Sequence, residues 1–288
     1  MIAKKMDIDC PVHAPCIELN YYEQGSGEPL VFIHGLGGNA DRWRLQLEAI
    51  SNNYRVLAMD LRGHGQSGYR VDEPVSIRAF ADDVMALLDK LGVNQAHICG
   101  LSLGGMIALE IFGRYAPKVK SLILADTTAF FQPTQAREEF LGLFDRLEMA
   151  SWAALLAGRI LRREAPAEQK QEVIQMLAAN QRALYRAGLI ATFDSDYRWV
   201  LPLIELPTLI LVGEEDQATP VGYAEYLQAN IRGSVLRVIP QAAHLSNLEN
   251  PATFNRQVMA HLQRCQRREK DPPFAARKRL IEPDTSQS

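Results

Sequence analysis

The sequence predicts an α/β fold in which a mostly parallel central sheet is flanked by helices and carries an inserted helical lid. Apolar runs of strand length alternate with amphipathic helical segments from residue 29 to about residue 125, and such runs return after residue 207. Between about Phe130 and Tyr197 the strand pattern gives way to helical sequence. Because the sheet pattern resumes afterwards, the helical stretch interrupts one domain rather than separating two.

The first part of the core is expected to contain alternating strands and helices. In order, these are the strand Leu30–Ile33, the helix Asp41–Ser51, the strand Tyr54–Met59, the helix Ser76–Leu91, a strand ending at Cys99, the helix Gly105–Tyr115 and the strand Ser121–Ala125. The segment Cys16–Tyr22 alternates apolar and polar residues before Gly25-Ser26-Gly27, which predicts an antiparallel edge strand.

The second part of the core follows the inserted segment. Helices are expected in that segment at Arg137–Leu147, Ser151–Leu161 and Ala167–Ala187, and beyond it strands at Pro207–Val212 and Val235–Ile239 with helices near Val221–Ile231 and Pro251–Arg264. We therefore predict a core formed by residues 1–129 and 198–264 and a helical lid at residues 130–197. Residues 265–288 contain three prolines and little periodicity, which predicts a disordered tail.

Charge and cysteine content exclude several classes of protein. With 31 basic and 34 acidic residues the net charge is −3, which is too balanced to indicate nucleic acid as a partner. The charged N-terminus and the lack of a long apolar run predict a cytoplasmic protein without a membrane span. Cys10, Cys16, Cys99 and Cys265 are too scattered for a disulfide framework or a zinc site, so free thiols are expected. The oligomeric state is left open.

The segment Gly100-Leu101-Ser102-Leu103-Gly104 lies between the apolar run His97-Ile98-Cys99 and the helical stretch Gly105–Tyr115. A strand, a tight turn and a helix place the central serine in a strained, exposed position. The flanking glycines are needed because the strand and helix backbones crowd together there. The pattern predicts Ser102 as a catalytic nucleophile, with the Leu103 amide at the helix start facing an oxyanion.

A serine hydroxyl is a weak nucleophile at neutral pH, so it needs a nearby base and a carboxylate that orients the base. In a strand-turn-helix site of this type the acid and then the histidine follow the serine, each just past a strand end. Asp216 follows the strand Pro207–Val212, and His244 follows the strand Val235–Ile239. We therefore predict Asp216 as the orienting acid and His244 as the base.

Other residues compete for these roles. Asp126 also follows a strand end, and Glu214 and Glu215 adjoin Asp216; Asp216 is favoured because its strand directly precedes the strand before His244. The other histidines have different expected places: His34 braces a glycine loop, His64 holds a turn, His97 lies within a strand, and His13 and His261 lie away from the catalytic loops.

A second oxyanion donor is expected from the loop after the strand Leu30–Ile33. This loop reads His34-Gly35-Leu36-Gly37-Gly38-Asn39, and its glycines let the backbone approach a ligand closely. We predict that the Leu36 amide is this donor.

At these residues the span from about 18 to 264 resembles the α/β-hydrolase superfamily. The segments Gly100–Ile107, Gly213–Pro220 and Ala243–Pro251 are most similar to those of the 3-oxoadipate enol-lactonases and related carboxylesterases. Haloalkane dehalogenases and epoxide hydrolases have aspartate at the position of Ser102, which argues against both. Carbon–carbon hydrolases usually have tryptophan after the catalytic histidine, where this chain has Leu245, so that activity is less favoured without being excluded.

The resemblance and the residues together imply a serine hydrolase that cleaves a small-molecule ester or lactone through an acyl-enzyme, with no metal or organic cofactor. Two alternatives stay open: cleavage of a carbon–carbon bond, and a non-catalytic ligand-binding protein on the same fold. Candidates for lining the pocket under the lid are the apolar residues Phe130, Phe131, Trp152, Leu155, Phe193 and Trp199. The lid arginines, among them Arg137, Arg159 and Arg186, are candidates for binding a substrate carboxylate, and the sequence does not choose among them.

Overall fold

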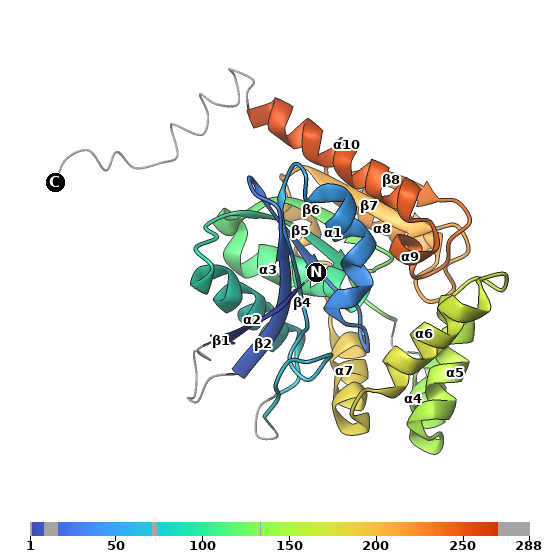
Figure 1. Ribbon diagram of the computed structural model, residues 1–288. Helices are drawn as coiled ribbons and strands as arrows, with labels where there is room; N and C mark the ends of the chain where they lie inside the picture. The colour runs from blue at the N-terminus through green and yellow to red at the C-terminus, as the bar shows by residue number, and fades with distance from the viewer. Residues whose placement is uncertain (1, 9–16, 71–73, 133, 270–288) are drawn as a thin grey trace.

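A computed structural model describes residues 2–8, 17–70, 74–132 and 134–269 (Figure 1). Within these residues a sheet of eight strands has the order β1-β2-β4-β3-β5-β6-β7-β8. The strands are β1 (Ala3–Ile8), β2 (Ile17–Gln24), β3 (Pro29–Ile33), β4 (Arg55–Met59), β5 (Ala96–Leu101), β6 (Val119–Ala125), β7 (Thr208–Gly213) and β8 (Val235–Ile239). Strands β3 to β8 run parallel to one another, and β2 pairs antiparallel with both β1 and β4. The predicted α/β fold with a mostly parallel sheet is confirmed.

The edge of the sheet differs from the prediction. The stretch assigned to an edge strand forms β2, which is antiparallel as expected, but β1 pairs along its outer side and is the edge. The sequence of β1 has Lys4, Lys5 and Asp7 on a largely exposed strand, so it lacks the apolar run that indicates a strand. Cys16, the first residue of the predicted strand, lies outside the described residues.

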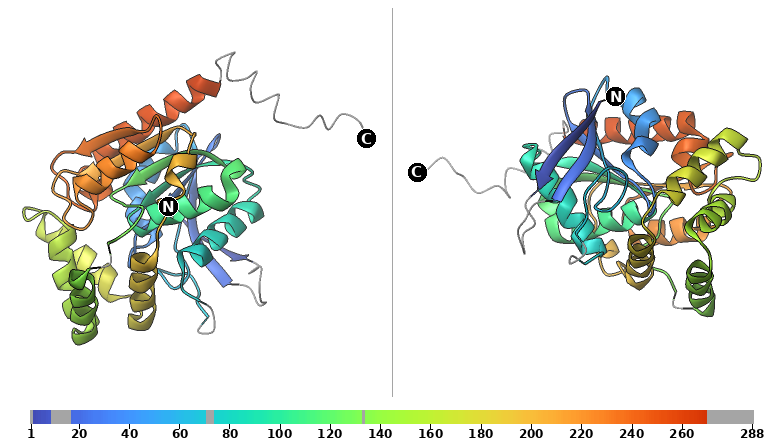
Figure 2. Two further views of the ribbon diagram at one scale, coloured as in Figure 1. Left: turned by 180° about the vertical axis from the view of Figure 1, so that it is seen from behind. Right: turned by 60° about the horizontal axis from the view of Figure 1, so that its bottom comes forward.

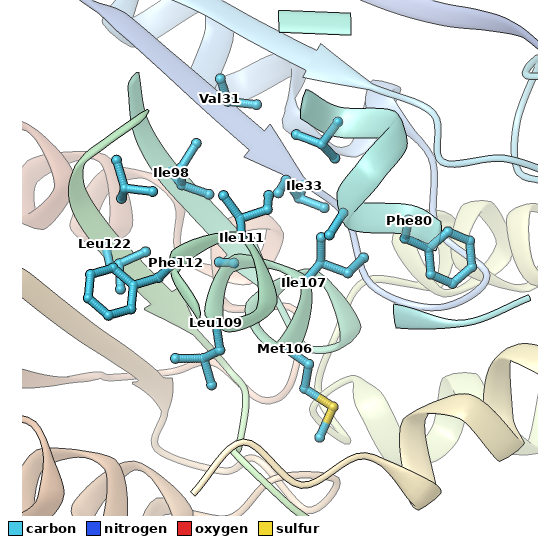
Figure 3. Close-up of a cluster of buried hydrophobic side chains, with 14 of the residues drawn as sticks. Val31, Ile33, Phe80, Ile98, Met106, Ile107, Leu109, Ile111, Phe112 and Leu122 are labelled. Carbon is cyan, nitrogen blue, oxygen red and sulfur yellow. The ribbon is translucent and has the colours of Figure 1, made fainter. Parts of the chain in front are cut away.

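Helices cover both faces of the sheet (Figures 1 and 2). One face packs against α2 (Ile77–Lys90), α3 (Leu103–Tyr115) and α8 (Val221–Asn230), and the other packs against α1 (Arg44–Ile50) and α10 (Pro251–Glu269). In Figure 3 the β3 side chains Val31 and Ile33 lie on the face that α3 covers, with Ile33 nearest to Ile107 and Ile111 of α3. Leu30 and Phe32 alternate with them and belong to the core on the other face. Burial on both faces explains why these strands are continuously apolar.

Four helices are inserted between β6 and β7 and project from one end of the molecule (Figures 1 and 2). They are α4 (Gln135–Arg146), α5 (Met149–Ile160), α6 (Ala167–Ala178) and α7 (Arg182–Asp194). The prediction of a single helix over residues 167–187 is wrong, because the helical backbone is interrupted between α6 and α7. At the break the side-chain amide of Asn180 lies 3.0 Å from the Met176 carbonyl oxygen and 3.1 Å from that of Leu177, so it caps α6.

The remaining helices are short. They are the 3₁₀ turns Ala40–Trp43, Ala116–Lys118 and Leu201–Leu203 and the single-turn helix α9 (Ser246–Glu249). Residues 265–269, the first part of the predicted tail, instead continue α10, and Cys265 is buried. The rest of the predicted tail, residues 270–288, lies outside the described residues, as do Cys10 and His13. Within the described part of the chain Cys99 and Cys265 are buried thiols that form no disulfide. None of the helices within the described residues has the length and hydropathy that a bilayer span requires.

Candidate active site

Ser102 occupies the turn between β5 and α3, and its backbone is strained. Its φ is +56°, a conformation that side chains other than glycine rarely adopt. A Cβ atom on Gly100 would lie 2.0 Å from the Gly104 carbonyl oxygen, and one on Gly104 would lie 2.2 Å from the Ile33 carbonyl oxygen. The two glycines are therefore required by close backbone approach, as the sequence predicts. The Ser102 side chain is partly exposed to the cavity described below.

His244 lies between Ser102 and Asp216. Its Nε2 is 2.9 Å from Ser102 Oγ, and its Nδ1 is 2.8 Å from Asp216 Oδ2. The structure thus brings together three predicted residues that lie far apart in the sequence. Strand order explains why they meet, because β5, β6, β7 and β8 are consecutive neighbours and their carboxyl ends share one edge.

The loop that carries His244 is held from two sides. The His244 amide donates to the Ile160 carbonyl oxygen at 3.1 Å, which joins the loop to the end of α5. Glu249 accepts from the Ala243 amide and, with its other oxygen, from the Arg162 amide, each at 2.8 Å. The inserted helices therefore help to fix the position of the imidazole.

Asp216 is held in one orientation by its own loop. Its Oδ1 accepts from the amides of Ala218 and Thr219 at 2.8 and 2.9 Å, and its Oδ2 accepts from the Thr219 hydroxyl at 2.9 Å. Burial alone would raise the pKa of Asp216, but the charge of His244 and these hydrogen bonds lower it below the usual range. Burial likewise opposes protonation of His244, yet the Asp216 carboxylate raises the His244 pKa above 6.5. The role of Thr219 was missed, although an aspartate followed three residues later by threonine is a signal of such a turn.

Asp126, the rival acid, is buried beside this site but has other partners. Its Oδ1 accepts from the Gly213 amide at 2.8 Å, and its Oδ2 accepts from the Ser246 hydroxyl at 2.5 Å. Burial first, and then the charge of Asp216, raise the pKa of Asp126 well above the usual carboxyl range. Asp126 therefore ties the end of β7 to the loop after His244. The other rivals, Glu214 and Glu215, have exposed side chains.

Leu36 and Leu103, the predicted oxyanion donors, both lie beside Ser102: Leu103 follows it directly at the start of α3, and Leu36 lies in the loop after β3. A Cβ atom on Gly35 would lie 3.1 Å from Ser102 Cβ, which shows how closely the loop before Leu36 approaches the nucleophile. Within the described residues neither amide donates to a protein acceptor, and both residues line the same cavity as Ser102 and His244. Both amides therefore stay candidates for the oxyanion donors that the sequence predicts.

His34 braces the glycine loop, as expected. Its Nδ1 donates to the Gly35 carbonyl oxygen at 2.7 Å, and its Nε2 accepts from the Leu61 amide at 3.0 Å. Burial lowers the pKa of His34 to about 4, so the ring stays neutral and keeps both bonds near neutral pH. His64 holds its turn through Nδ1, which donates to the Arg62 carbonyl oxygen at 3.0 Å.

A cavity of about 600 Å³ opens above Ser102, and all four inserted helices line it. Phe131 and Phe193, both candidates from the sequence, belong to its wall. Trp152 is instead fully buried among the inserted helices, and Trp199 is 55% exposed. Phe130 and Leu155 also lie outside the lining. Among the described residues, no group of three or more His, Cys, Asp or Glu side chains is arranged to hold a metal ion.

A second serine–histidine cluster, which the sequence analysis missed, lies at the opposite end of the sheet. Ser121 Oγ is 2.7 Å from His97 Nδ1 and 3.0 Å from His261 Nε2, and His97 Nε2 is 3.9 Å from Glu28 Oε2. We call Glu28, His97, Ser121 and His261 the amino-end cluster, because β3, β5 and β6 begin there. A signal existed in the sequence, since His97 and Ser121 fall at equivalent places on two predicted strands.

Comparisons with known proteins agree with this geometry. Residues 28–251 match the family described as alpha/beta hydrolase fold. The chain is 32% identical over 256 residues to 3-oxoadipate enol-lactonase 2 of Acinetobacter baylyi, an alignment that covers 86% of this chain and 94% of that protein.

Two solved structures are similar over almost their whole length. A thermophilic esterase from Thermogutta terrifontis has a TM-score of 0.85 and 26% identity, covering 91% of this chain and 99% of that one. The enol-lactonase from Burkholderia xenovorans has a TM-score of 0.80 and 26% identity, covering 86% of this chain and 97% of that one. The resemblance recognised in the sequence is thereby confirmed, and the protein is a hydrolase. The chain belongs to the α/β-hydrolase fold family.

Proposed function

We propose that this protein hydrolyses a carboxylic ester or a lactone through an acyl-enzyme on Ser102. The observation that carries the proposal is the continuous series of hydrogen bonds from Asp216 through His244 to Ser102, at 2.8 and 2.9 Å. It supplies a nucleophile, a general base and a group that orients the base. The similarity to enol-lactonases and an esterase supports the same class of substrate.

In the first step Ser102 Oγ bonds to the substrate carbonyl carbon while His244 Nε2 takes the hydroxyl proton. Asp216 accepts from Nδ1–H, so it selects the tautomer whose Nε2 is free to accept and stabilises the imidazolium that forms. The amides of Leu36 and Leu103 donate to the oxyanion, and each such donor is typically worth ~10²- to 10³-fold in rate. The carbon–oxygen ester bond then breaks, and His244 returns the proton to the leaving alkoxide.

In the second step a water molecule gives a proton to His244 and attacks the acyl carbon. The bond between the acyl carbon and Ser102 Oγ breaks, and the serine recovers its proton from the imidazolium. For a lactone the leaving alcohol stays attached to the acyl group, so the product is a single hydroxy or keto acid.

We infer that residues 130–197 act as a lid on the core that lies on both sides of them in the chain, and that this core ends with α10 rather than at residue 264. Support comes from the cavity wall, to which α4, α5, α6 and α7 all contribute. Gly188 of α7 also packs against the glycine loop at residues 34–39, which we call the oxyanion loop, since a Cβ atom on Gly188 would lie 2.4 Å from Leu36 Cδ1. The lid residues would therefore select the substrate and shield the acyl-enzyme from bulk water.

Labelling by a fluorophosphonate, followed by mass analysis of the peptides, tests the nucleophile. We expect one adduct, on the peptide containing Ser102, and none in Ser102→Ala. Steady-state rates on short aryl esters, an enol-lactone and a ring-cleavage dienoate then test the reaction class. Labelling elsewhere, or turnover of the dienoate alone, would contradict the proposal, and binding without any turnover would point to a non-catalytic protein.

A further inference from the structure

Four half-buried aromatic side chains form a continuous series in the lining of the active-site cavity. The ring centroids of Phe140 and Phe193 are 5.9 Å apart, those of Phe193 and Phe131 are 5.3 Å apart, and those of Phe131 and Tyr223 are 5.9 Å apart. Each pair meets edge-on, with ring planes inclined at 82°, 86° and 62° in the same order. We call these four side chains the aromatic wall.

The aromatic wall extends from the core into the inserted helices. Tyr223 belongs to α8 of the core, and Ala218, in the loop between Asp216 and α8, also lines the cavity. At the other end Phe140 of α4 meets Trp152 edge-on, with centroids 4.9 Å apart, and Trp152 is fully buried. The wall therefore begins beside the loop of the catalytic acid and is anchored in the interior of the inserted helices.

Two of the arginines that the sequence singled out lie against this wall. The guanidinium of Arg137 lies 5.5 Å from the ring centroid of Phe193, and that of Arg159 lies 5.8 Å from the ring centroid of Phe140. Arg186 instead pairs with an aspartate of α4, and it is not among the described lining residues. Rings that are held in place before a ligand arrives lose little freedom when the ligand covers them.

The size of the cavity indicates a substrate with a bulky apolar part. Its volume of about 600 Å³ is about four times the roughly 150 Å³ that is enough to hold benzene. More than half of its described lining residues are apolar or aromatic. A small lactone ring alone would leave most of this apolar surface uncovered, and covering such surface is favourable in proportion to its area.

We propose that the substrate carries an aromatic ring, joined by a short chain to the scissile ester or lactone group, and that this ring packs against the aromatic wall. The inference rests on the proposed ester or lactone hydrolysis and adds the class of side group to it. An aromatic ring is favoured over another apolar group of the same size, because edge-to-face ring pairs are stabilised beyond the area that they bury.

The test compares matched esters by kcat/KM. On the acyl side the pair is 4-nitrophenyl 3-phenylpropanoate and 4-nitrophenyl 3-cyclohexylpropanoate, and on the alcohol side it is the acetates of 2-phenylethanol and 2-cyclohexylethanol. In at least one pair the wild-type protein should prefer the phenyl member by roughly 2- to 10-fold, the worth of an aromatic pair. That member should also exceed 4-nitrophenyl acetate or ethyl acetate by roughly 10- to 100-fold, the worth of burying a phenylalanine-sized group.

Variants of the wall then assign the phenyl preference. Phe193→Leu removes the ring in the middle of the wall and keeps an apolar side chain, so the phenyl-to-cyclohexyl ratio should fall toward 1, and Tyr223→Leu should lower it as well. Tyr226→Leu is the matched control. Tyr226 is half-buried one turn further along α8, its ring lies 5.2 Å from that of Phe130, and it is not among the described lining residues, so the wild-type ratio should be kept. Melting temperatures of all variants check that the fold is intact.

Binding to Ser102→Ala separates this inference from the proposed function, because that variant lacks the nucleophile. Calorimetric titration should give a lower Kd for methyl 3-phenylpropanoate than for methyl 3-cyclohexylpropanoate, and Phe193→Leu in the same background should remove the difference. Equal rates within both wild-type pairs, or an unchanged ratio in both Phe193→Leu and Tyr223→Leu, would overturn the inference while cleavage of the esters leaves the proposed function standing. Preferential binding of the phenyl ester without cleavage or labelling of Ser102 would contradict the proposed function alone. If Phe193→Leu does not fold, Tyr223→Leu and the wild-type ratios still decide.

Discussion

Two clusters of serine, histidine and carboxylate lie at opposite ends of the same sheet. At the carboxyl ends of the strands Ser102 forms a hydrogen bond with His244, and His244 forms one with Asp216. At the amino ends Ser121 forms a hydrogen bond with His97 Nδ1, and His97 Nε2 lies 3.9 Å from Glu28 Oε2. Strand β5 connects the two clusters, because His97 lies near its start and Ser102 directly follows its end.

The residue types are the same, and the surroundings are not. Ser121 is 0% exposed and lies within β6, whereas Ser102 lies in a strained turn at the cavity. The hydroxyl of Ser121 is already shared between two histidines. Beside Ser102 the helix α3 begins, and the amides of Leu36 and Leu103 have no acceptor among the residues that the structure describes. Under the proposed function, access to the cavity and nearby oxyanion donors distinguish Ser102 from Ser121, because both serines have a hydrogen bond to histidine.

The carboxylate substitution expected to lower kcat most is Asp216→Asn, in the cluster at the carboxyl ends of the strands. The amides of Ala218 and Thr219 should hold the asparagine oxygen at the Oδ1 position, so its NH₂ group replaces Oδ2 opposite His244 Nδ1. An NH₂ group donates to Nδ1 and so favours the tautomer protonated on Nε2, which cannot take the serine proton, and kcat should fall roughly 10⁴-fold, as in other serine triads. The fold should be intact by circular dichroism, and the loss is measured with an aryl ester. Near-normal activity would transfer the role of acid to Asp126 or to a glutamate.

The pH dependence of activity tests the charge state of His244. The base must be neutral to accept a proton, and the Asp216 carboxylate raises the His244 pKa above 6.5. Below that pKa, kcat/KM should fall tenfold for each pH unit, and the midpoint of this limb should lie above 6.5 in the wild-type protein. In Asp216→Asn the same midpoint should move to lower pH, which titration of the residual rate would detect. An unchanged midpoint would mean that Asp216 does not set the charge of the base.

The sequence was sufficient to select Ser102, Asp216 and His244, because each of them follows the end of a strand. Parallel neighbouring strands deliver such residues to one edge, whatever their separation along the chain. The choice between Asp126 and Asp216 was harder, since both follow strands that are neighbours in the sheet. The choice depends on the path of the loop after β7, in which the Thr219 hydroxyl donates to the same Asp216 oxygen that faces His244.

Three features were beyond the sequence for physical reasons. Strand β1 gains its structure from pairing with β2, so its own sequence carries little apolar pattern. The break between α6 and α7 depends on Asn180, whose side chain also lies 3.0 Å from the Gly37 carbonyl oxygen of the oxyanion loop. In the amino-end cluster the strand positions indicate the pair His97 and Ser121, but they do not indicate that His261 of α10 packs against Ser121, because no local pattern relates those two residues.

A smaller effect is expected from Asp126→Asn. Burial and the nearby Asp216 charge raise the pKa of Asp126, so the carboxyl holds a proton more readily than usual, and asparagine resembles that form closely. Its oxygen can still accept from the Gly213 amide, so kcat should change by less than about tenfold, the worth of one hydrogen bond. The measurement is kcat on the aryl ester used for Asp216→Asn. A loss of 10³-fold or more would show that the two carboxylates act as a unit.

The smallest effect on activity is expected at the amino-end cluster, from Ser121→Ala. Removing the hydroxyl leaves buried nitrogens of His97 and His261 without their shared partner, which should cost about 1–3 kcal/mol of unfolding free energy. Because Ser121 is distant from the cavity wall, kcat/KM should stay at the wild-type value. Urea unfolding and ester hydrolysis measure the two quantities on the same preparation. Ser102→Ala is the reciprocal control, since it should abolish turnover while it changes stability little. If Ser121→Ala lowered kcat/KM without lowering stability, the two ends of the sheet would be functionally coupled and the contrast drawn between them would fail.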